Sequence, residues 1–231
     1  MDDRKAMLRD IEAEVAFTRR EIGKDALDER AMAAMARVPR ERFIPEPYRH
    51  RAFDNGPVPI GHGQTISQPY IVALMTDLLR PRPDSVILEI GTGSGYQAAV
   101  LAELVAQVYS IEVVGELAAA AGERLQRLGY DNVTVRHADG YHGWPEFAPF
   151  DGIIVTAASP RIPPPLVEQL KPGGRLVIPL GLPGDAQALT VVEKCDDGTV
   201  VRRNILMVAF VPLTRMSPQM STQPSIGMGP Y

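Results

Sequence analysis

The residues whose types and spacing best suit chemistry are a glycine-rich stretch and three acids. The stretch is Gly91-Thr92-Gly93-Ser94-Gly95, and the apolar run before it contains Glu89. Glu112 ends the next apolar run, about 20 residues after the first glycine, and Asp139 precedes Gly140. A glycine backbone can approach a ligand closely, and an acid at that distance can bind a ribose diol. These residues predict a nucleoside cofactor site, and a plain strand-to-helix turn is the structural alternative.

The spacing of the glycines and the number of acids distinguish between cofactors. The pattern G-x-G-x-G differs from the G-x-G-x-x-G of dinucleotide-binding enzymes. Three acids suit a ligand with a diol, an exocyclic amine and a positively charged sulfonium, and they do not suit a pyrophosphate. We therefore expect S-adenosyl-L-methionine (SAM), with Glu112 at the ribose and with Asp139 and Gly140 beside the adenine. A turn or helix cap is the alternative role for Asp139.

A second group of candidate residues lies in the segment 57–70, PVPIGHGQTISQPY. Its glycines allow the backbone to bend, and Ser67 lies just before Pro69, which can begin a helix. Ser67 could contact a substrate, or it could serve only as a helix N-cap. A serine-hydrolase role is disfavoured because Ile66 and Gln68 flank the serine, so the G-x-S-x-G elbow is absent.

Strands and helices that alternate along the chain must position these residues. Apolar periodicity predicts strands at 86–90, 108–112, 133–137, 151–156 and 175–179, with helices at 96–107, at 116–128 and around 166–170. This alternation is typical of right-handed βαβ units. Two further apolar runs, 188–193 and 200–211, flank Asp196-Asp197-Gly198 and predict an antiparallel hairpin. We expect an α/β fold: a doubly wound, seven-stranded, mainly parallel Rossmann-like sheet.

The segments on either side of this core have a different character. Helices are predicted at 3–21, at 26–36 with Asp25 as its cap, and at 67–80. We expect a single domain at 1–213, in which 1–80 is a helical and substrate-loop part and 81–213 is the core with its hairpin. The tail, 214–231, is rich in Pro, Met, Ser and Gln, and we expect it to be irregular.

The overall composition limits the choice of partners. The chain has 231 residues and a net charge of −4, so it has no broad electrostatic footprint for nucleic acid. Five arginines cluster in 37–51, and we expect them on a solvated face; they are Arg37, Arg40, Arg42, Arg49 and Arg51. One cysteine excludes an internal disulfide and a multi-cysteine zinc site, and we expect no metal. No apolar run approaches the ~18 residues of a membrane span, so we expect a soluble, cytoplasmic monomer.

Two classes of nucleic-acid methyltransferase are also disfavoured. Enzymes that methylate base amino groups carry an Asn/Asp-Pro-Pro-aromatic motif after the fourth strand, where this chain has Thr156-Ala157-Ala158-Ser159-Pro160. Cytosine C5 chemistry needs a nucleophilic cysteine, commonly after proline, and Cys195 follows Lys194.

From about residue 28 to 213 the chain resembles the protein-L-isoaspartate (D-aspartate) O-methyltransferases, which repair damaged aspartyl and asparaginyl sites. The stretches that carry this resemblance are Pro59-Ile60-Gly61-His62-Gly63-Gln64-Thr65-Ile66-Ser67-Gln68-Pro69, Val38-Pro39-Arg40-Glu41-Arg42-Phe43, Ile87-Leu88-Glu89-Ile90-Gly91-Thr92-Gly93-Ser94-Gly95-Tyr96, Asp139-Gly140, 150–158, Leu170-Lys171-Pro172-Gly173-Gly174 and Phe210-Val211-Pro212-Leu213. The first of these is the most specific.

The resemblance implies SAM as the methyl donor, a damaged protein or peptide as the acceptor, and Ser67 as the active-site residue. It implies a cofactor site at Glu89, Gly91, Thr92, Gly93, Ser94, Gly95, Glu112, Asp139 and Gly140. It implies an acceptor site at Ile60, Gln64, Thr65, Ile66, Gln68, Val211, Pro212 and Leu213.

The implied reaction needs no general base. An isoaspartyl residue carries a free carboxyl with a pKa near ~3.5, so it is ionised at pH 7. Ser67 would position this carboxylate through a hydrogen bond and would not act as a nucleophile. Two alternatives remain: a relative that binds SAM or protein without turnover, and a methyltransferase that acts on small carboxylic acids.

Overall fold

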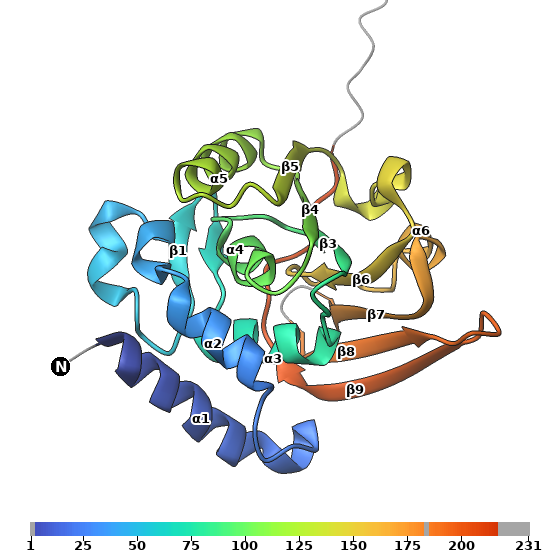
Figure 1. The fold of residues 1–231 in the computed structure, drawn as a ribbon, viewed down its shortest axis with the longest axis horizontal. Helices are drawn as coiled ribbons and strands as arrows, with labels where there is room; N and C mark the ends of the chain where they lie inside the picture. Colours follow the sequence, from blue (N-terminus) through green and yellow to red (C-terminus); the bar gives the residue numbers. More distant parts are fainter. Residues whose placement is uncertain (1–2, 183–184, 217–231) are drawn as a thin grey trace, which may run out of the picture.

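A seven-stranded sheet forms the centre of the computed structural model, which describes residues 3–182 and 185–216. The strand order is β5-β4-β3-β6-β7-β8-β9 (Figure 1). The strands are β3 (Val86–Ile90), β4 (Gln107–Glu112), β5 (Val133–His137), β6 (Phe150–Val155), β7 (Leu170–Leu180), β8 (Gln187–Lys194) and β9 (Val200–Val208). The predicted fold class is confirmed, and β5 and β3 have the predicted bounds.

The position of β3 in the sheet determines where a ligand can bind. This strand pairs in parallel with β4 on one side and with β6 on the other, whereas β8 and β9 are antiparallel to their neighbours. The chain therefore reverses its direction of winding at β3, and a crevice opens there beyond the carboxyl ends of the strands. The predicted glycine stretch follows β3 directly.

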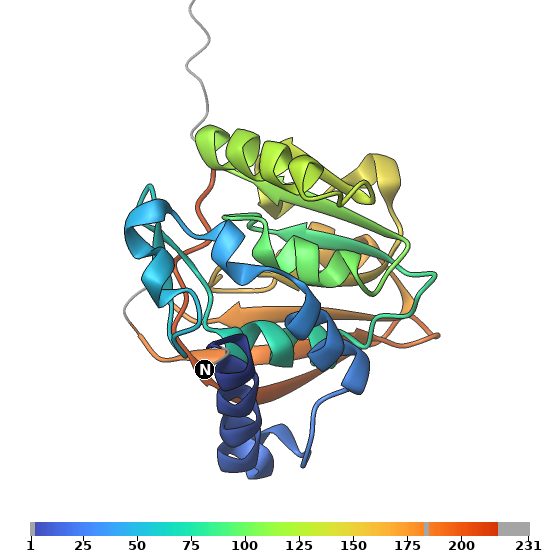
Figure 2. The same ribbon diagram turned by 60° about the vertical axis from the view of Figure 1, so that its left-hand side comes forward.

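Helices cover both faces of the sheet, as two views of the ribbon show (Figures 1 and 2). They are α1 (Asp3–Ile22), α2 (Glu29–Arg37), α3 (Pro69–Leu79), α4 (Tyr96–Ala102), α5 (Gly115–Arg127) and α6 (Pro164–Glu168). Alternate residues of each strand point to opposite faces. Ile87 of β3 therefore joins a core with the N-terminal helices, and Leu88 joins a second core on the other face.

Contacts at the ends of α2 and α4 explain why these two helices differ from their predicted bounds. Helix α2 begins at Glu29 because Asp28, rather than Asp25, is its N-cap and accepts hydrogen bonds from two backbone N–H groups. Helix α4 ends at Ala102, where the side chain of Asn132 donates to the carbonyls of Ala102 and Val105. The chain then pairs with Ser85 to begin β4. The contacts of Asn132 and Ser85 come from residues distant in sequence, which helix periodicity does not detect.

Short elements connect the N-terminal helices to the core. Residues 40–66 contain two 3-10 helices, η1 (Arg40–Phe43) and η2 (Glu46–Arg51), and a small hairpin of β1 (Val58–Gly61) and β2 (Gln64–Ile66). The irregular segment before β6 contains η3 (Gly140–His142) and η4 (Pro145–Phe147).

The C-terminal part of the chain returns to the centre of the sheet. The predicted β8–β9 hairpin is confirmed, with its turn closed between Cys195 and Thr199. After β9, Ala158 donates to the carbonyl of Val211 and accepts from the N–H of Leu213, each at 2.8 Å. Residues 214–216 have no regular structure, and the rest of the predicted irregular tail lies outside the described residues.

Candidate active site

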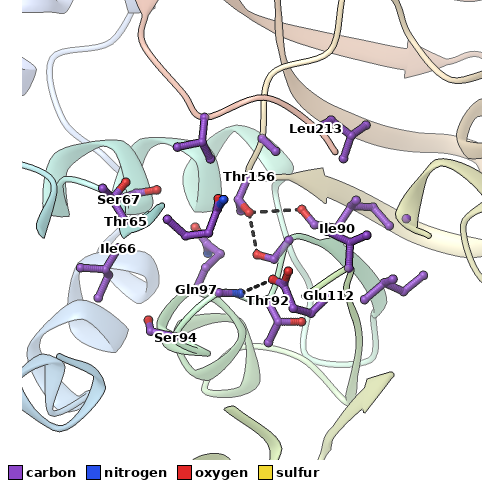
Figure 3. A pocket seen from close by; sticks show the side chains of 18 of the residues that line it. Thr65, Ile66, Ser67, Ile90, Thr92, Ser94, Gln97, Glu112, Thr156 and Leu213 are labelled. Atoms are coloured by element: carbon purple, nitrogen blue, oxygen red, sulfur yellow. Dashed lines mark hydrogen bonds between the residues drawn. The ribbon is translucent and has the colours of Figure 1, made fainter. Parts of the chain in front are cut away.

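A pocket lies at the carboxyl ends of β3, β4 and β6 and brings most of the predicted site residues together. Its lining includes Gln64, Thr65, Ile66, Ser67, Gly91, Thr92, Gly93, Ser94, Glu112, Gly140, Thr156, Val211, Pro212, Leu213 and Thr214. Figure 3 shows Thr65, Ile66 and Ser67 on one side of this pocket, and Glu112 and Thr92 on another. The hairpin β1–β2, the glycine loop and the chain after β9 thus form a single concave site.

The glycine loop is held against β6 by Thr156. Its hydroxyl donates to the carbonyl of Gly91 at 2.6 Å and to that of Ile90 at 3.2 Å. The backbone of Gly91 has φ 97°, and a Cβ there would lie 2.4 Å from the Thr156 oxygen. Only glycine permits both this conformation and this approach. At Gly91 the loop therefore presents backbone to the pocket.

The carboxylate of Glu112 fixes the other side of the same loop. One oxygen accepts from the N–H of Gly93 at 2.7 Å (Figure 3). The other accepts from the N–H of Val114 at 3.0 Å. Each carboxylate oxygen can accept a second hydrogen bond. Glu112 lines the pocket, so it retains acceptor capacity for ligand hydroxyls.

Glu89 lies beneath the pocket and is not part of its lining. It is fully buried and accepts a hydrogen bond from the hydroxyl of Ser110, which lies 2.5 Å from the hydroxyl of Thr92. Burial raises the pKa of Glu89 to about 8, although the bond from Ser110 opposes this shift. Its carboxyl is therefore mostly protonated at pH 7, and Ser110 links it to Thr92 of the glycine loop.

Asp139 is not part of the pocket lining, whereas Gly140 is. One Asp139 oxygen accepts from the N–H of Tyr141 at 3.0 Å, and the other accepts from Nε of Arg215 at 2.7 Å. Partial burial would raise the pKa of Asp139, but the hydrogen bonds from Arg215 and Tyr141 outweigh it and lower the pKa. This carboxylate caps the turn at η3, as the alternative role for Asp139 predicted. A Cβ on Gly140 would lie 2.4 Å from Ile90, so close packing requires glycine there.

Ser67 lines the pocket but does not cap helix α3. That helix begins at Pro69, and its N-cap is Gln68, so the N-cap alternative for Ser67 is wrong. Across residues 3–182 and 185–216, the Ser67 hydroxyl has no hydrogen-bond partner, whereas its carbonyl accepts from Nη2 of Arg40 at 2.7 Å. The hydroxyl is thus available to a ligand.

Arg40 corrects the expectation that the arginine cluster forms a solvated face. Arg37, Arg42 and Arg49 are exposed, but Arg40 is 0% exposed. Its Nε donates to the carbonyl of Ala52 at 2.8 Å, and its guanidinium lies 4.7 Å from the centre of the Tyr96 ring. Sequence composition missed this residue because charge alone does not report burial. Its place in Val38-Pro39-Arg40-Glu41-Arg42-Phe43 was the available signal.

Two predicted acceptor residues lie beside the pocket rather than in its lining. Ile60 approaches the glycine loop, where a Cβ on Gly93 would lie 3.3 Å from it. The side chain of Gln68 donates to Asn55 at 3.0 Å. The lining also includes residues that were not among the predicted site residues, and those with polar side chains include Gln97, Thr156 and Thr214.

The described part of the chain holds no group of three or more His, Cys, Asp or Glu residues placed to bind a metal ion. Among the helices of residues 3–182 and 185–216, none has the length and apolar character needed to cross a membrane.

Comparisons with known proteins give a consistent result. The sequence profile of the protein-L-isoaspartate(D-aspartate) O-methyltransferase family matches residues 16–217. The chain is 62% identical over 211 residues to protein-L-isoaspartate O-methyltransferase 2 of Syntrophobacter fumaroxidans, with 91% of this chain and 85% of that protein aligned.

Two solved structures are also similar. One, a protein-L-isoaspartate O-methyltransferase, is 27% identical with a TM-score of 0.78; the match covers 90% of this chain and 65% of that one. The other comes from Plasmodium falciparum, is described as a protein-L-isoaspartate O-methyltransferase and contains S-adenosyl-L-homocysteine. It is 26% identical with a TM-score of 0.75, and the match covers 93% of this chain and 99% of that one.

Proposed function

The chain belongs to the protein-L-isoaspartate(D-aspartate) O-methyltransferase family, and from this premise we propose how its pocket carries out the family's reaction. The enzyme transfers a methyl group from SAM to the free carboxylate of an isoaspartyl residue in a damaged protein, and we extend this to D-aspartyl residues. The following backbone nitrogen would then attack the methyl ester and expel methanol, which forms a succinimide and initiates repair. The observation that carries the proposal is the unpartnered Ser67 hydroxyl in the pocket formed by the glycine loop.

The residues present fit SAM. The loop Gly91–Gly95 offers a cradle that a Cβ at Gly91 would fill, and the unused acceptor positions of Glu112 suit a ribose diol. We assign the adenine to the side of the pocket formed by Gly140, with Asp139 holding that turn through Tyr141. We assign Glu89 an indirect role, in which it supports Thr92 through Ser110. When bound, SAM supplies an electrophilic methyl group.

The protein's part in the reaction is to position the acceptor and to exclude water. The isoaspartyl carboxylate is already ionised near pH 7, so no side chain has to remove a proton. Ser67 donates a hydrogen bond to one carboxylate oxygen and leaves the other free to face the methyl group. Correct alignment of the reacting atoms can supply a large part of the rate acceleration.

Backbone from two segments would hold the acceptor chain. Gln64, Thr65 and Ile66 line one side of the pocket, and Val211, Pro212 and Leu213 line another. We propose that both segments pair with an extended peptide, and that Ile60 and Gln68 support them from behind.

We also propose that residues 1–213 form one domain and that the enzyme works as a cytoplasmic monomer. The continuous core on each face of one sheet supports the single domain.

The test is transfer of labelled methyl from SAM to an isoaspartyl peptide, with the matching aspartyl peptide as control. We expect transfer to the first peptide only. SAM binding by calorimetry without transfer would indicate a non-catalytic relative. Transfer to small carboxylic acids and not to the peptide would indicate the small-molecule alternative.

A further inference from the structure

An open groove of about 540 Å³ adjoins the proposed active site. Four residues line both the groove and the cofactor pocket: Thr65, Ser67, Thr156 and Val211. The groove extends from them to the side chain of Phe17 on α1 and to the end of β9 at Met207. It is therefore a continuous path from the Ser67 hydroxyl to the surface.

Two large apolar side chains at this groove are exposed. Phe17 is 82% exposed and Met207 is 61% exposed, and they come from segments far apart in the sequence. A single exposed apolar side chain needs no explanation, but two that line one groove beside a catalytic residue form an apolar surface that a ligand can cover.

Four polar side chains of the groove already have hydrogen-bond partners: Glu14, Thr18, Gln68 and Tyr70. The side chain of Asn55 donates to Glu14 at 3.0 Å and accepts from Gln68 at 3.0 Å. The hydroxyls of Thr18 and Tyr70 lie 2.5 Å apart. These bonds tie α1 to the start of α3, next to Ser67, so the wall that carries Phe17 is fixed relative to the site.

We propose that this groove binds an apolar side chain of the acceptor polypeptide, from a residue within a few positions of the isoaspartyl residue. The inference rests on the proposed function, because it takes the isoaspartyl carboxylate to lie at Ser67. The acceptor is a polypeptide, so the rest of its chain must extend out of the site through an opening. The groove meets the site at the lining residues that the two share. An extended chain rises about 3.3 Å per residue, so a near neighbour of the modified residue reaches the groove.

The proposal makes the residues of the groove determinants of acceptor preference. A leucine of the bound peptide would cover apolar surface on Phe17 and Met207. A serine at the same position of the peptide would not. Partial burial of one leucine side chain should lower KM by roughly three- to tenfold.

The experiment compares isoaspartyl peptides in which a single leucine moves along an otherwise Ser/Gly sequence, from three residues before the modified site to three residues after it. Labelled-methyl transfer gives KM and kcat for each peptide with the wild-type enzyme, with Phe17→Ser and with Met207→Ser. The matched control is Val201→Ser, because Val201 is 58% exposed on the same strand β9 but does not line the groove.

With the wild-type enzyme we expect a lower KM when leucine occupies one or two of these positions. This preference should be lost in Phe17→Ser and reduced in Met207→Ser. Val201→Ser should behave like the wild type. Equal KM for all peptides, or an unchanged preference in Phe17→Ser, would overturn the groove assignment while transfer itself upholds the proposed function. No transfer to any isoaspartyl peptide would overturn both. A second copy of the chain could occupy the groove in place of the peptide, and sedimentation of the same proteins tests this alternative. If the wild type self-associates and Phe17→Ser does not, while the peptide preference is unchanged, the proposal is overturned.

Discussion

Nη2 of Arg40 donates a 2.7 Å hydrogen bond to the backbone carbonyl of Ser67. A fully buried cation from the N-terminal part of the chain therefore holds the segment that carries the proposed active-site hydroxyl. The same guanidinium also holds the carbonyl of Ala52, so one side chain joins the loop at Ala52 to the segment that carries Ser67. This contact leads to the first prediction.

Replacing Arg40 should impair both folding and turnover. Arg40→Met leaves the carbonyls of Ala52 and Ser67 without their donor, at a cost of roughly 1–3 kcal/mol each. Turnover should fall more than SAM affinity, because Ser67 moves while the glycine loop stays. Urea unfolding, calorimetry and kcat with an isoaspartyl peptide measure these effects. Arg40→Lys should recover part of the loss, and Arg42→Met, at an exposed neighbour, is the control. A folded Arg40→Met enzyme with normal kcat would contradict the assignment.

Ser67→Ala should reduce turnover without reducing stability. The hydroxyl caps no helix, so the melting temperature should stay near that of the wild type, with a change in unfolding free energy within about 0.5 kcal/mol. A misaligned acceptor can lower kcat by ~100-fold. Ser67→Thr should be intermediate, and Ser67→Cys should resemble Ala because a thiol donates weakly. The measurements are kcat and thermal melts, and a normal kcat for Ser67→Ala would remove this residue from the mechanism.

Glu112→Ala should weaken SAM binding at least tenfold, which corresponds to about 1.4 kcal/mol. The change removes the acceptor for ribose hydroxyls and also releases the N–H of Gly93, which the carboxylate holds at 2.7 Å. Glu112→Gln keeps an acceptor oxygen and should lose less. Calorimetric titration with SAM is the measurement, and Glu116→Ala on the exposed face of α5 is the control. Affinity equal to that of the wild type would exclude Glu112 from the site.

Glu89 should make the protein less stable as pH rises. Its pKa is about 8 in the folded chain against a reference value of 4.5, so the folded state keeps a proton that the unfolded state releases between these values. The stability that this proton provides is complete below pH 4.5 and is lost as pH rises through 8. Glu89→Gln stays neutral and does not lose this contribution. The unfolding free energy of Glu89→Gln minus that of the wild type should therefore increase by roughly 2–4 kcal/mol from pH 5 to pH 8.5.

Urea unfolding at several pH values measures the effect of Glu89→Gln. Glu12→Gln, on the exposed face of α1, controls for the loss of one carboxyl group. Parallel curves for wild type and Glu89→Gln across this pH range would show that the buried carboxyl is already ionised.

Local patterns in the sequence predict the strands well, because each apolar run lies between clear turn residues. The core strand β3 and the glycine loop after it have the predicted positions. The environment of single charged residues depends on distant contacts. Arg40 is buried because the carbonyls of Ala52 and Ser67 surround it, and Asp139 is engaged by Arg215, 76 residues away. Composition and periodicity contain no information on such pairings.

The return of the chain after β9 has a consequence for biosynthesis. Val211, Pro212 and Leu213 line the cofactor pocket, yet a ribosome makes them after every strand of the sheet. At roughly 5–20 residues per second, the glycine loop and Glu112 emerge several seconds before the segment that covers them. A nascent chain that ends at Phe210 has the strands but lacks three residues of the pocket lining, so the pocket is completed only after β9 has been made.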